Sequence, residues 1–188
     1  MILECRDLER SFGGLKALKG VTFGIEKGEI FGLVGPNGSG KTTIVNAITG
    51  FYPPDRGQII FEGKDITGIR PHQVAPLGIA RTFQNLALFR GMSVLDNIMM
   101  GRHTHMRPSA LASLFYWVWA EPEEIRQREL VEDTIDFLQL QDVRDLPIEV
   151  VPLGLQKRIE LARALVSEPR LLILDEPMAG MNQEEKEY

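Results

Sequence analysis

The sequence predicts an α/β fold, with short apolar strands beside helices and a helical block inserted into the α/β core. Two observations lead to this prediction. Apolar runs at residues 30–34 and 171–174 are followed directly by glycine or by acidic residues, as in buried strands that end in polar loops. Between these runs, roughly over residues 85–149, the sequence reads as helical.

The N-terminal part contains the elements of one half of the core. Residues 18–25 mix apolar and polar side chains and predict a half-exposed strand, and residues 59–61 predict another short strand. Residues 43–49 predict a helix that stops at Gly50. Residues 53–57 have the proline, aspartate and glycine composition of a turn.

The remaining helices are predicted from caps and periodicity. Ser93 is a good N-cap for a helix through Met99, and Val131, Ile135 and Leu138 share one face of a longer helix over residues 121–140. A last helix is expected where apolar residues recur with helical spacing from Leu155 to Val166. We therefore predict a core in residues 1–84, a helical subdomain in residues 85–150, and a return to the core in residues 151–188.

Composition limits the classes of function. The chain has 188 residues, a net charge of −5 and one cysteine, so it needs no oxidising compartment and has no basic stripe for nucleic acid. Its first residues are charged too early for a signal peptide. The longest nearly apolar stretch, residues 110–120, is shorter than the roughly 18 residues that span a bilayer. We expect a cytosolic chain whose membrane role, if it has one, depends on a partner.

A phosphate cradle is the strongest motif. Residues 35–42 fit the pattern G-x-x-x-x-G-K-[ST], between a predicted strand and a predicted helix. Glycines allow backbone N–H groups to surround phosphates, and the helix N-terminus favours anions. Lys41 would reach the outer phosphates, and the Thr42 hydroxyl would bind Mg²⁺. The candidate nucleotide-binding residues here are Gly35, Pro36, Asn37, Gly38, Ser39, Gly40, Lys41, Thr42 and Thr43.

Two carboxylates follow the apolar run at residues 171–174. Asp175, at the end of a buried strand, could hold Mg²⁺ directly or through water, opposite Thr42. Glu176 could then polarise the attacking water as a general base. On its own, this pattern also fits a strand that ends in a solvated acidic turn. Together with the cradle, it predicts a nucleoside triphosphatase that uses ATP and Mg²⁺.

With the cradle and the strand at Asp175, residues 151–158 (VPLGLQKR) complete a resemblance to the ATPase subunits of ABC transporters. These residues occupy the place of the family signature Leu-Ser-Gly-Gly-Gln. Within the family, the sequence is most similar to the ATPases of branched-chain amino acid importers, also over residues 175–182. The resemblance covers nearly the whole chain. It implies a P-loop core of the RecA-like type, with N-terminal antiparallel strands and an inserted helical subdomain.

The resemblance also implies roles for single residues. Phe12 matches the aromatic residue that stacks on adenine, although an ordinary core or surface aromatic is the plain alternative. Gln84 matches the glutamine that senses Mg²⁺ and the γ-phosphate, so it is a candidate for both catalysis and metal binding. Residues 179–182 match a loop that touches the second ATPase. The implied signature segment, which acts on the partner's ATP, consists of Val151, Pro152, Leu153, Gly154 and Leu155.

The implied assembly is a homo- or heterodimer of ATPases that sandwiches two ATP molecules. Its partners would be transmembrane permease subunits and, indirectly, a solute-binding protein, with no nucleic acid. The chain would lie peripherally on the cytoplasmic face of the membrane. We expect it to power import of branched-chain or similar amino acids. The alternatives are a lipid or lipopolysaccharide exporter ATPase and a soluble ABC ATPase without a transport function.

The sequence departs from the family pattern in two places. Pro152 stands where the signature serine would be and has neither hydroxyl nor N–H, although proline is tolerated at a helix start. The family also continues past Tyr188 with a strand and a histidine that contacts the γ-phosphate. We therefore expect a C-terminally incomplete core. An aromatic cluster remains open between a packing role and a docking role; it consists of Phe115, Tyr116, Trp117 and Trp119.

Overall fold

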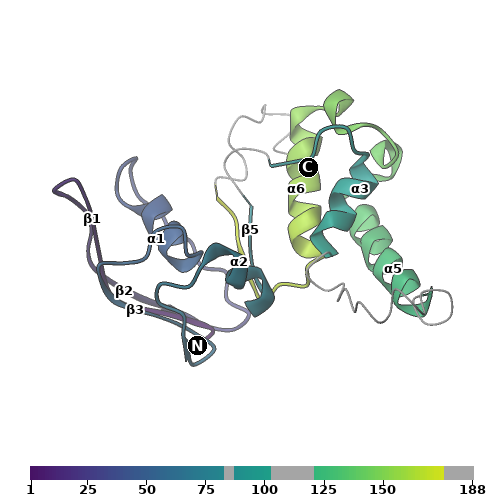
Figure 1. The fold of residues 1–188 in the computed structure, drawn as a ribbon. Helices are drawn as coiled ribbons and strands as arrows, with labels where there is room; N and C mark the ends of the chain where they lie inside the picture. The colour runs from purple at the N-terminus through teal and green to yellow at the C-terminus, as the bar shows by residue number, and fades with distance from the viewer. Residues whose placement is uncertain (83–86, 103–120, 176–188) are drawn as a thin grey trace. The chain divides into compact units, whose positions relative to one another are not determined.

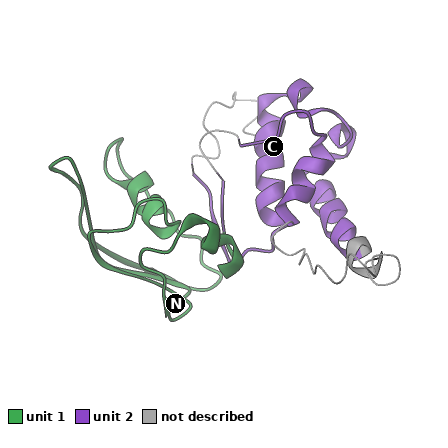
Figure 2. Ribbon diagram, viewed as in Figure 1, with its two compact units in different colours: residues 1–79 green, residues 80–188 purple. Residues whose placement is uncertain are grey.

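The computed structural model describes residues 1–82, 87–102 and 121–175, and only the backbone of residues 121–125. The chain divides into two compact units, residues 1–79 and residues 80–188 (Figure 2). Each unit has buried apolar side chains of its own.

Unit 1 contains a four-stranded antiparallel sheet in the order β2-β1-β3-β4 (Figure 1). Leu3 of β1 pairs with Ile25 on one side and with Phe61 on the other. The strands predicted at residues 18–25 and 59–61 are confirmed as parts of β2 and β3. The strands are β1 (Leu3–Phe12), β2 (Leu15–Ile25), β3 (Arg56–Phe61) and β4 (Lys64–Asp65).

Helix α1 (Lys41–Ile48) lies against β2 and buries Ile44 and Ala47. It stops where the sequence predicts, because Gly50 has a φ of +76° and its N–H donates to the carbonyl of Ala47. Two short helical turns, α2 (Pro71–Val74) and η1 (Ala75–Leu77), close the unit. The thiol of Cys5 is fully buried, and burial raises its pKa to about 12.

The strand predicted at residues 30–34 is wrong for this structure. These residues have no regular secondary structure, and Ile30 and Val34 are fully or almost fully exposed. A strand needs a neighbour for its backbone N–H and C=O groups. Within the described ranges, no named strand pairs with residues 30–34. The ring of Phe31 instead stacks on that of Phe23 in β2, with centroids 5.3 Å apart.

Unit 2 consists mainly of helices. The N-cap prediction at Ser93 is confirmed, since its hydroxyl accepts a hydrogen bond from Asp96 N at 3.1 Å. In the described part of this unit, the α-helices are α3 (Val94–Met99), α5 (Glu121–Phe137) and α6 (Leu153–Leu165), and the 3₁₀ turns are η2 (Met100–Arg102), η4 (Gln141–Val143) and η5 (Ile148–Val150).

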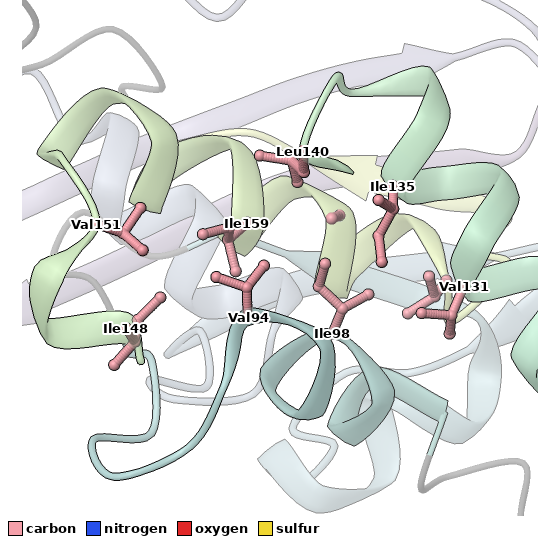
Figure 3. Close-up of a cluster of buried hydrophobic side chains, with 10 residues drawn as sticks. Val94, Ile98, Val131, Ile135, Leu140, Ile148, Val151 and Ile159 are labelled. Carbon is pink, nitrogen blue, oxygen red and sulfur yellow. The ribbon is translucent and has the colours of Figure 1, made fainter. Parts of the chain in front are cut away.

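The apolar faces predicted from helical spacing meet in one core (Figure 3). Val131 and Ile135 of α5 are fully buried, and Leu138 packs against the same cluster. From α6, Ile159 and Ala162 are fully buried, which confirms the periodicity of that helix. The core also includes Val94, Ile98, Leu140, Ile148, Val151 and Val166.

Strands β5 (Ile79–Arg81) and β6 (Leu171–Ile173) form a two-stranded sheet. The strand predicted at residues 171–174 is thus confirmed, but its burial is not. Its side chains are only half-buried, and Leu174 is exposed. In the described part of the chain, β6 pairs only with β5, which leaves its other edge uncovered there.

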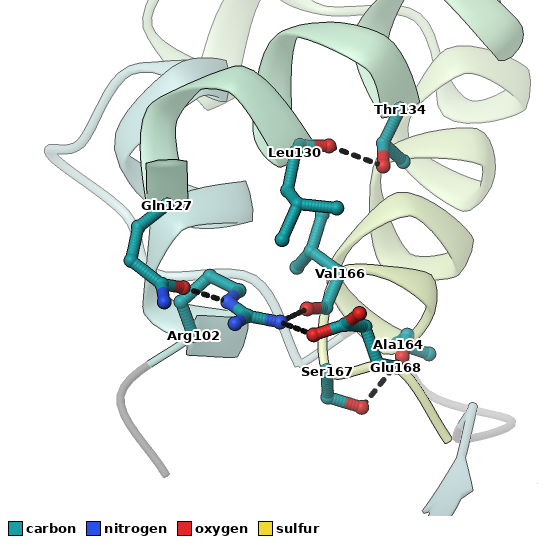
Figure 4. Close-up of polar contacts among 8 residues, drawn as sticks. All are labelled: Arg102, Gln127, Leu130, Thr134, Ala164, Val166, Ser167 and Glu168. Atoms are coloured by element: carbon teal, nitrogen blue, oxygen red, sulfur yellow. Dashed lines mark hydrogen bonds and ion pairs between the residues drawn. The ribbon is translucent and has the colours of Figure 1, made fainter. Parts of the chain in front are cut away.

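A buried arginine ties three segments of unit 2 together (Figure 4). The Arg102 side chain is 3% exposed. Its guanidinium donates to the side-chain oxygen of Gln127 in α5 and to the carbonyl of Val166 at the end of α6. It also forms an ion pair of 2.8 Å with Glu168. Removing a buried donor leaves its acceptors unsatisfied, which costs about 1–3 kcal/mol per group.

We expect Arg102→Met to lower the free energy of unfolding of unit 2 by about 2–6 kcal/mol, because two buried acceptors lose their donor. Urea unfolding at constant slope measures this change. Arg144→Met is the matched control, since Arg144 pairs with Glu132 at a part-exposed site. An equal loss of unfolding free energy in both variants would show that burial of the Arg102 contacts adds nothing to stability.

Candidate functional site

The predicted phosphate cradle forms the loop that leads into α1. Gly40 is the N-cap of this helix and has a φ of +96°. A Cβ at Gly40 would lie 2.8 Å from the carbonyl oxygen of Ala17 in β2, so only glycine fits there. In unit 1 no side chain caps α1, and its first turn has no acidic residue. The backbone N–H groups at the start of α1 therefore suit an anion.

Lys41 lies folded back over this loop. Its Nζ donates to the carbonyl oxygens of Gly35 at 2.6 Å and of Pro36 at 2.9 Å. The positive charge is thus held beside the same backbone that would surround a phosphate. Most of the loop is open to solvent; its exposed residues are Pro36, Asn37, Gly38, Ser39 and Thr42, and Gly35, Gly40, Lys41 and Thr43 are half-buried.

Phe12, the candidate adenine-stacking residue, is 39% exposed at the end of β1. The guanidinium carbon of Arg10 lies 5.0 Å from its ring centroid, and the ring of Tyr52 meets it in a T-shaped contact at 5.5 Å. Arg10 is fixed by hydrogen bonds to Asp55 Oδ1 at 2.8 Å and to the carbonyl of Pro53 at 2.9 Å. Phe12 is therefore a supported surface aromatic and not a core residue.

Asp175 lies two residues beyond β6, in unit 2. Its Oδ2 accepts a hydrogen bond of 2.7 Å from Nη2 of Arg81, the last residue of β5. Its backbone N–H donates to Oγ1 of Thr82 at 3.3 Å. A carboxylate oxygen is a ligand that Mg²⁺ prefers, and so is the hydroxyl of Thr42. The donor chemistry of these two residues fits that ion.

The predicted signature segment forms the start of α6. Pro152 is the N-cap, with φ −55° and ψ 150°, so the proline is compatible with the helix start. Leu153 is exposed and Gly154 is buried. The Gln156 side chain donates to the carbonyls of Val151 at 2.8 Å and Ile148 at 3.3 Å, so it fixes the segment before the helix.

Several predicted site residues lie outside the described residues. These are Gln84, Glu176, the loop at residues 179–182 and the aromatic cluster at residues 115–119. Among the others, the structure brings Phe12 and the cradle into unit 1, and the signature segment and Asp175 into unit 2.

Four supporting residues were not found from the sequence. Arg81 is 94 positions from Asp175, and no motif spacing connects them. Arg10, two positions before Phe12, contacts its ring with the guanidinium. Tyr52 contacts the same ring from a turn that is distant in the sequence. Gln156 lies next to the signature segment in sequence, but no motif predicts its side-chain hydrogen bonds to Val151 and Ile148. For a fifth supporting residue, Asp55, the sequence does contain a local signal, because it lies in the predicted turn at residues 53–57.

Comparisons with known proteins identify the family of the chain. A family profile described as "ABC transporter" matches residues 18–179. The branched-chain amino acid transport ATP-binding protein BraF of Pseudomonas aeruginosa is 38% identical over 98% of this chain and 72% of its own length. The corresponding probable protein LivG of Archaeoglobus fulgidus is 41% identical over 96% of this chain and 69% of its length.

Solved structures give the same answer for the fold. A nucleotide-free ATP-binding cassette from an ABC transporter matches with a TM-score of 0.79 and 37% identity, over 98% of this chain and 72% of that one. An ADP conformation of an ABC transporter cassette matches with a TM-score of 0.81 and 36% identity, over 99% and 72%. These matches confirm the predicted α/β cassette fold with antiparallel N-terminal strands. The chain therefore belongs to the ABC transporter family and is an ATP-binding cassette ATPase.

Proposed function

We propose that this chain binds and hydrolyses ATP to power an importer of branched-chain or similar amino acids. The observation that carries the proposal is the start of α1, where uncapped backbone N–H groups, a glycine that nothing larger can replace, and Lys41 meet. The choice of solute is supported by the names of the two relatives, both ATP-binding proteins of branched-chain amino acid transport.

Within unit 1, the backbone of residues 35–43 would bind the phosphates, and Lys41 would exchange its two carbonyl partners for phosphate oxygens. Phe12 would stack on adenine through the part of its ring that Arg10 and Tyr52 leave exposed. The guanidinium over the other part of the ring holds it in place.

Mg²⁺ would be held by Thr42, Asp175 and Gln84. When bound with ATP, this ion neutralises charge that develops on the transferred phosphate. Glu176 would accept a proton from the attacking water as general base. One or two carboxylates suffice for Mg²⁺ at a phosphate site. Among the described residues, no group of three or more acidic, histidine or cysteine side chains is arranged to hold a metal ion.

The N-terminus of α6 would face the γ-phosphate bound to a second ATPase subunit. Val151 to Leu155 would supply this contact, with backbone N–H groups in place of the missing serine hydroxyl. Among the described residues, no helix is both long and apolar enough to cross a membrane. We propose that transmembrane permease subunits supply the pathway, that a solute-binding protein delivers the amino acid, and that this chain works peripherally at the cytoplasmic face.

Reconstitution tests the proposal. The chain and its candidate permease subunits are placed in proteoliposomes, and ATP hydrolysis and uptake of radiolabelled leucine are measured together. We expect uptake that depends on ATP and hydrolysis that rises when the solute-binding protein carries leucine. Hydrolysis stimulated by lipid and not by leucine would favour an exporter. Hydrolysis unaffected by any permease would favour a soluble ATPase.

A further inference from the structure

An ion pair that no sequence motif predicts joins the end of β5 to a residue just beyond β6. Nη2 of Arg81 lies 2.7 Å from Oδ2 of Asp175. The Arg81 side chain is 8% exposed and that of Asp175 is 13% exposed. A pair at this depth is screened far less by solvent than a surface pair. The Asp175 carboxylate, which we propose as a ligand of Mg²⁺, is thus held by the guanidinium of Arg81.

The backbone around Asp175 is fixed by the residue that follows Arg81. Thr82 is buried, and its N–H donates to the carbonyl of Ile173 at 3.0 Å. Its hydroxyl oxygen in turn accepts the N–H of Asp175 at 3.3 Å. Asp175 is thus restrained through its main chain by Thr82 and through its side chain by Arg81.

The ion pair engages one of the two carboxylate oxygens. Oδ2 accepts from Arg81, while no hydrogen bond joins Oδ1 to any residue in the described ranges. A carboxylate held in this way has a fixed plane and presents one oxygen. Carboxylates that bind metals are in general hydrogen-bonded by outer partners, and these partners set their orientation.

We propose that Arg81 is a positioning residue, which holds Oδ2 of Asp175 so that Oδ1 faces Mg²⁺ or a water bound to it. This inference rests on the proposed metal role of Asp175. It extends the site to a residue that none of the predicted site motifs contains. The planar guanidinium suits the task better than an ammonium, because its N–H groups point in fixed directions.

The test measures how much Mg²⁺ strengthens ATP binding. The dissociation constant of a fluorescent ATP analogue is determined in excess EDTA and in Mg²⁺. The constant in EDTA divided by the constant in Mg²⁺ is the ratio that is compared between variants. We expect Arg81→Met to reduce this ratio by roughly 10-fold, at the lower end of the 10–100-fold effects of outer-shell changes. Affinity in EDTA should stay unchanged, since the proposal gives Arg81 no contact with the nucleotide. Arg81→Lys should restore part of the ratio.

A double-mutant cycle shows whether Arg81 acts through Asp175. The double variant with Asp175→Asn and Arg81→Met should have the same ratio as the single variant Asp175→Asn. This double variant also removes both members of the buried pair, so it guards against a fold that fails with an unpaired carboxylate. Arg144→Met is the control, because it breaks the ion pair with Glu132 in the same unit.

The outcomes separate this inference from the proposed function. A wild-type ratio near one would overturn both the metal role of Asp175 and the role of Arg81. If Asp175→Asn brings the ratio close to one while Arg81→Met leaves it unchanged or raises it, the role of Arg81 alone is overturned. Equal losses of affinity with and without Mg²⁺ in Arg81→Met would also overturn it, because they indicate a merely structural residue.

Discussion

Replacing Glu176 with glutamine should leave ATP binding close to wild type and slow turnover by roughly 10²–10⁴-fold, the range for loss of a general base. Glutamine has nearly the same shape as glutamate but cannot accept the proton of the attacking water. Because hydrolysis is what reopens the proposed dimer, ATP should then trap two subunits together. Light scattering with and without ATP, beside a phosphate-release assay, measures both effects.

Glu129→Gln is the matched control for this change. Glu129 is an exposed carboxylate on α5, so the same chemical substitution there should alter neither turnover nor association. Unchanged steady-state turnover in Glu176→Gln would remove Glu176 from the mechanism. Loss of ATP binding in that variant would instead assign Glu176 a role in holding the nucleotide.

Lys41→Ala should weaken ATP binding by about 10–100-fold. The change removes a charged hydrogen bond to phosphate, worth about 1.5–3 kcal/mol. It also removes the two bonds that hold the ammonium over Gly35 and Pro36. Equilibrium binding of a fluorescent ATP analogue measures the loss, and thermal unfolding of the free protein shows whether the loop itself has changed.

Lys27→Ala provides the control for charge. Lys27 is exposed in unit 1 and is not one of the predicted site residues, and its replacement changes the net charge by the same amount. Its ATP affinity should match that of wild type. If both lysine variants bound ATP equally weakly, the loss of positive charge in general would explain the weaker binding, and Lys41 would have no specific role.

The sequence predicts elements well where the decisive contacts are local. The Ser93 cap depends on a residue three positions away, and the stop of α1 depends on the φ of Gly50. The faces of α5 and α6 follow from helical spacing alone. The strand prediction for residues 30–34 is wrong for the opposite reason. A strand requires a partner strand, and a local sequence pattern does not contain that partner.

The site divides in the same way. The cradle and the start of α6 are contiguous segments, so their residues could be read from motifs. The Arg81–Asp175 pair joins positions 94 apart, and only tertiary structure reveals it. The support of Phe12 by Tyr52 is also non-local. The subdomain boundaries at residues 84/85 and 150/151, and the roles of all the candidate site residues, stay predictions.

Arg102 has a consequence for α6 beyond stability. The peptide dipoles of a helix sum to a macrodipole, with partial negative charge at the C-terminus and partial positive charge at the N-terminus. At the C-terminal end of α6, the guanidinium of Arg102 donates to the carbonyl of Val166, which gives one of the free carbonyls at this end a partner. At the other end, the first turn has no acidic residue and no side-chain cap. The positive pole at Leu153 is therefore left for an anion from outside the helix.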